Sequence, residues 1–204
     1  HQLSVAQQVK VFNTTYRWNT ISRTVGNNVN SKNAQTAVAV VYGPLQFANC
    51  TFDGNTVACA SPLPDYPAKS AVILARKNAN TALVGCTVNG NTAADGDLFL
   101  AERTSTNACY VVNSILWGGT GHVAATAEGL LGPELHVLNS VVHGLNAGAA
   151  FVAEAVGNVS GSPSLKAWYG TAPVMARRPA GDSAARTVGR SIYVDGNVLA
   201  IPTD

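Results

Sequence analysis

The sequence is poor in charge. Asp, Glu, Lys and Arg make up 12% of its 204 residues, about half of the quarter that is usual in soluble domains, and the net charge is only +2. No basic patch interleaved with aromatic residues is present, so nothing favours nucleic-acid binding. Because mixed charge normally keeps a monomer dispersed, we expect neighbouring subunits, glycans or a matrix to cover part of this surface.

The sequence also lacks long apolar runs and familiar catalytic motifs. No run approaches the roughly 20 residues of a membrane span. No Gly-rich phosphate loop joins a strand to a helix, and no serine stands in a nucleophile elbow. The 11 acidic residues do not gather as paired acid–base or calcium chemistry requires. We therefore expect no cofactor, no metal and no catalytic residue, and lean toward a protein that is not an enzyme.

What the sequence does contain is one recurring phrase. It reads Asn-Cys-Thr-Phe-Asp-Gly-Asn-Thr at residues 49–56, and copies begin 36 residues before and then 36, 28 and 26 residues apart. The first residues of the copies are Asn13, Asn49, Gly85, Asn113 and Asn139. A repeat of this length indicates stacked structural units.

Each phrase predicts two strands that meet at a corner. Apolar residues two apart precede and follow the first residue, which is strand spacing, and Asn and Gly tolerate the left-handed backbone of a bend. A third strand-like run, such as residues 70–75, lies between phrases. The sequence therefore predicts an all-β parallel β-helix with three short strands per coil and about five to six coils. The five first residues should form a structural corner ladder, at a spacing of about 4.8 Å per coil.

The phrases at residues 49–55 and 113–118 resemble secreted right-handed parallel β-helix proteins related to polymorphic outer-membrane-protein repeats and the pectate-lyase-like superfamily. Residues 157–165, 178–182 and 189–196 are similar to the closing segment of those proteins. The resemblance implies one structural domain, with β-helix coils over residues 1–165 and an extended C-terminal segment, residues 166–204, packed on the last coils. It also implies a secreted or cell-surface location.

The four cysteines suit an oxidising compartment. Cys50 and Cys86 hold the same place in neighbouring phrases and should lie one above the other. We expect at least one disulfide among Cys50, Cys86, Cys59 and Cys109, with the pairing left open. The alternative is a buried ladder of free thiols.

Two further sets of residues are candidate sites. Asp95, Asp97, Glu102 and Arg103 are the nearest approach to a ligand site, although a charged loop is the stronger interpretation. Asn158 heads an Asn-Val-Ser sequence and is the one reasonable glycosylation site, since the other Asn-x-Thr sequences coincide with the predicted corner.

These features favour an extracellular structural or adhesive β-helix subunit. We expect it to assemble into a filament or surface layer, or to form part of a larger surface protein, because open solenoid ends invite further strands. Its partners would be copies of itself or other extracellular surface proteins, with glycans as a further class. The alternative is a carbohydrate-active or glycan-binding β-helix of the polysaccharide lyase or hydrolase type, because its superfamily hosts many functions on one fold.

Overall fold

The computed structural model describes residues 9–24, 35–41, 43–60, 68–75, 80–100, 108–119, 123–125, 134–149, 151–159, 161–165, 192–194 and 197–199. Within these ranges every regular element is a β-strand. No helix among them is long and apolar enough to cross a membrane.

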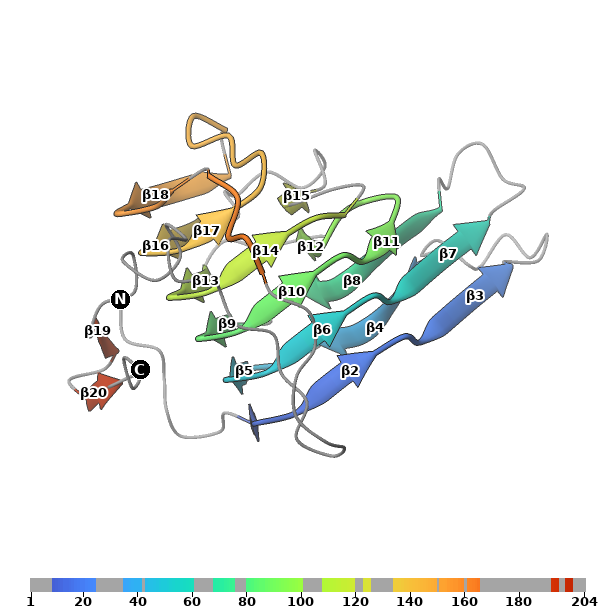
Figure 1. Cartoon of the computed structure of the whole chain (residues 1–204), viewed down its shortest axis with the longest axis horizontal. Coiled ribbons are helices and arrows are strands. Elements are labelled where there is room, and N and C mark those ends of the chain that lie inside the picture. Colours follow the sequence, from blue (N-terminus) through green and yellow to red (C-terminus); the bar gives the residue numbers. More distant parts are fainter. Residues whose placement is uncertain are drawn as a thin grey trace.

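Four parallel sheets make up the body of the molecule (Figure 1). The first sheet contains β1 (Val9–Phe12), β5 (Leu45–Ala48), β9 (Thr81–Val84), β13 (Ala108–Val112), β16 (Glu134–Leu138) and β18 (Val152–Val156). The second contains β2 (Thr15–Arg17), β6 (Thr51–Asp53), β10 (Thr87–Asn89), β14 (Ile115–Trp117) and β17 (Val141–Val142). The third contains β3 (Thr20–Thr24), β7 (Thr56–Ala60) and β11 (Thr92–Ala93), and the fourth contains β4 (Gln35–Val41), β8 (Lys69–Ala75), β12 (Leu98–Leu100) and β15 (Val123–Ala125).

The chain visits the sheets in order and then returns to the first sheet one coil further on. This arrangement confirms the predicted all-β fold of parallel strands in stacked coils, and we call it a β-solenoid. About three strands per coil were expected, and β1–β4, β5–β8 and β9–β12 give the first three described coils four each. The additional strand arises because a Gly-Asn bend, as at Gly54 and Asn55, separates the second sheet from the third.

The core lies inside the coils, where equivalent residues of successive turns stack. Phe52, Val88 and Leu116 pair in register across the second sheet and are fully buried. Phe47 of the first sheet packs edge-on against Phe52, with ring centroids 5.3 Å apart. Burial of each such side chain is worth about 1.5–3 kcal/mol, so the regular columns are the main source of stability.

The C-terminal segment is described only in part. Residues 166–191, which hold most of the segment predicted to pack on the last coils, lie outside the described residues. Beyond them, β19 (Ile192–Val194) and β20 (Asn197–Leu199) pair antiparallel.

Candidate functional site

The five first residues of the phrase occupy one corner of the solenoid. Asn13, Asn49, Gly85, Asn113 and Asn139 all have left-handed backbone angles, with φ between 47° and 61°. Each backbone N–H donates to the carbonyl that precedes the next corner, as from Asn49 to Val84 over 2.9 Å. The side chains of the first two corners join the ladder, since Asn49 Nδ2 donates to Asn13 Oδ1 over 2.7 Å.

Gly157 is a sixth corner that the sequence comparison of phrases missed. Its φ is 66°, and Asn139 N donates to the carbonyl of Val156 just before it. A Cβ at this position would meet Asn139 Oδ1, so any side chain here would require the Asn139 amide to move. The available signal was a glycine, a residue that tolerates left-handed backbone angles, 18 positions after Asn139. The sequence interpretation instead placed this glycine in the closing segment.

The residues that follow each corner form a second column inside the coil. Ser114 Oγ donates to Val112 O over 2.8 Å or to Leu83 O over 3.2 Å, so it links its own strand to the preceding coil. Cys50, Cys86 and Ser140 make the corresponding contacts with main-chain carbonyls at 2.8–3.5 Å. Cys50 and Cys86 are thus buried free thiols in neighbouring coils, as the alternative to a disulfide predicted, and each is a weak hydrogen-bond donor at this corner.

The expected disulfide is absent, because none of the four cysteines is bonded to another. Cys50, Cys86, Cys59 and Cys109 are all free thiols. Cys50 and Cys86 do stand in neighbouring coils, since Thr87 N donates to Cys50 O over 2.9 Å. Burial raises the pKa of the Cys86 thiol well above its usual range, which disfavours the reactive thiolate.

Asn158 ends the second column. Its Nδ2 donates to Val137 O over 2.7 Å, and its Oδ1 accepts from Ser140 N over 2.9 Å. Attachment of a glycan would replace a proton of this amide and disturb the contact with Val137. Glycosylation at Asn158 stays a prediction.

A third column, which sequence analysis read only as bend residues, is an asparagine ladder. Asn19 Nδ2 donates to Asn55 Oδ1, and Asn55 Nδ2 donates to Asn91 Oδ1, both over 2.8 Å. The main chain joins it, because Asn55 N donates to Asn91 Oδ1 over 2.9 Å and Asn91 Nδ2 donates to Phe52 O over 3.0 Å. Asn55 and Asn91 are buried, so each pair satisfies polar groups that water cannot reach.

The structure describes two of the four residues of the predicted ligand site, Asp95 and Asp97. Asp95 accepts hydrogen bonds from Lys69 Nζ over 3.0 Å and from Ser70 N over 2.7 Å. Asp97 instead is buried beside Asn91, and burial raises the pKa of its carboxyl well above the usual range. Glu102 and Arg103 lie outside the described residues. No group of three or more His, Cys, Asp or Glu residues in the described part of the chain could hold a metal ion.

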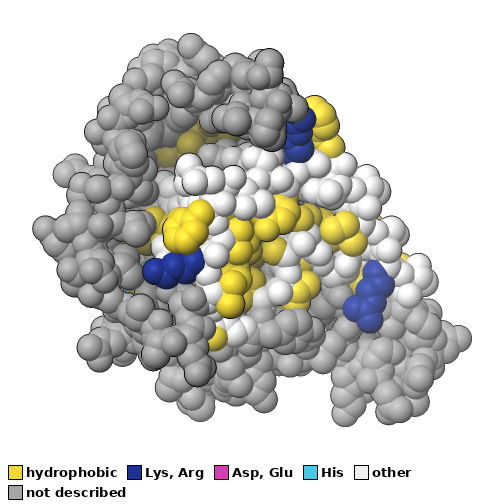
Figure 2. All heavy atoms as spheres, turned by 90° about the horizontal axis from the view of Figure 1, so that it is seen from below, with side chains coloured by type: hydrophobic (Ala, Val, Ile, Leu, Met, Phe, Trp, Pro, Cys, Tyr) yellow, Lys and Arg dark blue, Asp and Glu magenta, His cyan; other side chains and the backbone are white. Residues whose placement is uncertain are grey.

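The first coil presents an apolar end. Val9, Phe12 and Trp18 are 59%, 55% and 62% exposed, and the Arg17 guanidinium lies 4.2 Å from the Trp18 ring centre. Figure 2 views this end and shows hydrophobic side chains across its centre, with Lys and Arg side chains nearby and no described acidic side chain in view. Exposed apolar groups of this size on open strand edges are typical of an interaction surface.

The opposite end of the first sheet carries a carboxylate. Glu154 on β18 is exposed, and its Oε2 lies 3.0 Å from His136 Nδ1 on β16. The His136 ring stacks on Tyr110 of β13 with centroids 4.7 Å apart, so the residue beneath Glu154 is held in place. Val156 of the same strand is 56% exposed.

Comparison with protein-family models, curated proteins and solved structures finds no significant match to this chain.

Proposed function

We propose that the chain is an extracellular structural or adhesive subunit that self-associates, or joins a larger surface protein, through the ends of its solenoid. The observation that carries this proposal is the exposed apolar end of the first coil. Val9 and Phe12 lie on β1, the outermost strand of the first sheet, and Trp18 lies in the bend after β2. Open sheet edges with apolar side chains pair readily with another strand.

The interior of the solenoid supports a structural role. Its corners and buried amide ladder use polar side chains to bind neighbouring coils, as at Asn55. We also propose right-handed winding, because parallel strands joined by crossovers are right-handed in nearly all proteins. The resemblance to secreted pectate-lyase-like and outer-membrane-repeat proteins supports an extracellular location and this family assignment.

Sedimentation velocity over a range of protein concentrations, followed by negative-stain microscopy, tests the proposal. We expect concentration-dependent oligomers or filaments of the wild-type protein. Phe12→Ser combined with Trp18→Ser removes apolar area from exposed positions and should shift the distribution toward the monomer. A wild-type protein that stays a monodisperse monomer at every concentration contradicts self-association.

The carbohydrate-active alternative receives less support from the described residues. Asp95 is engaged by Lys69 and Ser70, and Asp97 is buried, so the two carboxylates do not form an acid–base pair at one open surface. Incubation with a panel of polyuronates, with and without calcium, distinguishes the two functions. Unsaturated or reducing products that disappear in Asp97→Asn would favour the enzyme.

A further inference from the structure

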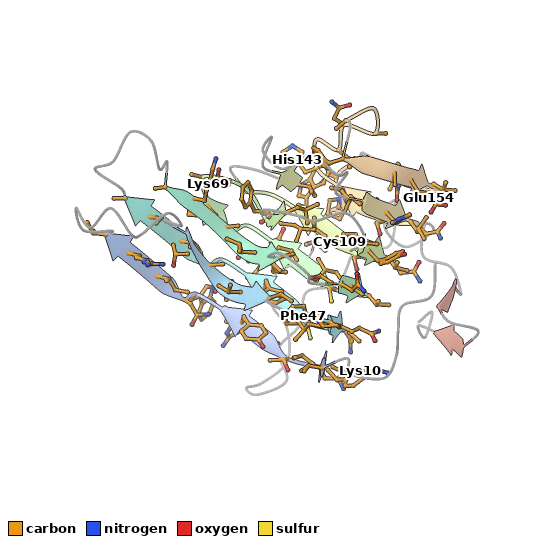
Figure 3. All side chains as sticks on the ribbon, turned by 180° about the vertical axis from the view of Figure 1, so that it is seen from behind. Lys10, Phe47, Lys69, Cys109, His143 and Glu154 are labelled. Atoms are coloured by element: carbon orange, nitrogen blue, oxygen red, sulfur yellow. The ribbon has the colours of Figure 1, made fainter. Side chains whose placement is uncertain are left out.

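We propose that two copies dock head to tail, with β1 of one copy extending the first sheet beyond β18 of the other in the register that the sheet already keeps inside each copy. This docking rests on the proposed self-association and specifies its surface, its partner and its register. Figure 3 shows the two residues that mark the surface, Lys10 and Glu154, at opposite ends of the first sheet.

The register follows from one column of the first sheet. Lys10 pairs with Gln46, Gln46 with Ala82, Ala82 with Tyr110, Tyr110 with His136, and His136 with Glu154. The next position in this column, about 4.8 Å beyond Glu154, would be Lys10 of a second copy. The column therefore begins with a cation and ends with an anion, which attract each other when the column continues into a neighbour.

The neighbouring columns match in the same register. Phe12 and Val156 are the two ends of one column, and they are 55% and 56% exposed. Docking would cover these two apolar side chains with each other. Val11 and Ala155 end the adjacent column, whose inner members Phe47, Leu83, Val111 and Val137 belong to the core. The hydrophobic interior would thus continue across the junction.

The corner also continues without a collision. Asn13 of the second copy would lie over Gly157, just as Asn113 lies over Gly85 inside one copy. Inside the copy, each corner N–H donates to the carbonyl before the next corner, for example Gly85 N to Val112 O over 3.0 Å. The Gly157 N–H would donate to Phe12 O of the second copy by the same rule.

Charge selects head-to-tail docking over the symmetric alternatives. Residues 9–24 contain Lys10, Arg17 and Arg23 and no acidic residue, whereas Glu154 is the one charged residue of 151–165. Head-to-head contact would oppose three cations to three cations, and tail-to-tail contact would oppose two carboxylates. The proposed contact between copies involves the first sheet and the start of the second sheet, where Val159 bridges to Val141 within one copy.

A charge-swap experiment tests the register. Lys10→Glu and Glu154→Lys each replace the attraction by a repulsion, and we expect each to weaken association about tenfold in sedimentation velocity at low salt. The double variant Lys10→Glu/Glu154→Lys restores opposite charges and should recover wild-type association. An equimolar mixture of the two single variants should also assemble, because each end then meets an opposite charge.

Thr56→Glu is the matched control, since it adds a charge at an exposed residue of β7 in an inner coil and should leave association unchanged. If the wild type assembles and the single variants assemble equally well, the head-to-tail surface is wrong while self-association stands. Stronger association of Lys10→Glu alone, or no recovery in the double variant, also overturns the register. A monomeric wild type overturns both the docking and the proposed function.

Discussion

The fold alters the acid–base chemistry of Asp97. This residue stands at the end of the asparagine ladder, where the Asn91 side chain donates a hydrogen bond to it, and its Oδ2 has no partner among the described residues. Burial is the largest effect on its pKa and raises it well above the ordinary value of 3.8. The folded chain therefore holds a proton that the unfolded chain releases at a lower pH.

Because the folded pKa of Asp97 is raised, Asp97 makes the free energy of unfolding fall as pH rises. The contribution of protonated Asp97 to stability is fully present below its unfolded pKa and is lost as pH rises toward its folded pKa. We expect Asp97→Asn, which keeps a neutral side chain of the same shape, to gain on the wild type as pH rises. The gain in the free energy of unfolding is about 1.4 kcal/mol for each pH unit between the two pKa values. Urea denaturation at several pH values above 4 measures it.

Asp95→Asn is the appropriate control. It removes the carboxylate that contacts Lys69 Nζ and Ser70 N, so it should not stabilise the protein. A constant difference between Asp97→Asn and the wild type across this pH range would show that Asp97 is ionised in the folded protein, contrary to its burial.

The corner positions could be predicted because they repeat along the sequence. The roles of residues that depend on which side chains surround them in the fold could not. The corner positions, such as Asn49 and Asn113, stand out because they must adopt a left-handed backbone that favours Asn and Gly. The role of Asn55 and Asn91 as a ladder was missed because a Gly-Asn pair also reads as a simple bend. Asp97 looked like its partly buried neighbour Asp95, since sequence alone does not show which of two nearby carboxylates faces the interior.

At the scale of elements, the third sheet ends where asparagine is replaced by glycine. Gly119 occupies the place of Asn91 one coil further on, and a Cβ on Gly119 would lie 2.5 Å from Asn91 O. The chain therefore approaches the preceding coil too closely for a side chain. Among the described residues, β11 is the last strand of the third sheet. The repeat also shortens here, because the corners before and after β11, Gly85 and Asn113, lie 28 residues apart, whereas the earlier corners lie 36 residues apart.

Gly119→Ala should therefore destabilise the solenoid. The added methyl group must displace the main chain of Asn91, and we expect a loss of about 1–3 kcal/mol in the free energy of unfolding by chemical denaturation. Gly43→Ala is the matched control, because a Cβ there meets nothing within 4 Å. The control should change stability by at most about 1 kcal/mol and in the favourable direction, since alanine restricts the unfolded chain. Equal losses in both variants would contradict close packing at Gly119.

The order of the strands was predictable, whereas their number per coil was only approximate. Apolar alternation marks β5 and β9 clearly, and the repeat spacing alone places them side by side. The third sheet was absorbed into the bend because β11 has only two residues, and a strand this short carries no periodicity in sequence.

For the whole molecule, the coils define a gradient of burial. The strands of the inner coils, such as β8 and β9, are almost entirely buried, whereas β1 and β18 at the ends of the first sheet are largely exposed. In a stack where each repeat contacts only its neighbours, the end coils lack one neighbour and open most readily. Association through the ends would remove this difference, but lateral association would not.

Hydrogen exchange distinguishes these two modes of assembly. Val9 N and Asn13 N donate to the second coil, so the alternating amides of Lys10 and Phe12 face away from it. In the dilute monomer we expect the amides of Lys10, Phe12 and Gly157 to exchange fast and those of β8 and β9 to exchange slowly. In the assembled protein, head-to-tail docking gives all three end amides strand partners, so their exchange should slow at least tenfold while the inner strands change little. Protection that appears instead on β3 and β7, with these three amides unchanged, would mean that the copies pack side by side and that the solenoid ends remain open.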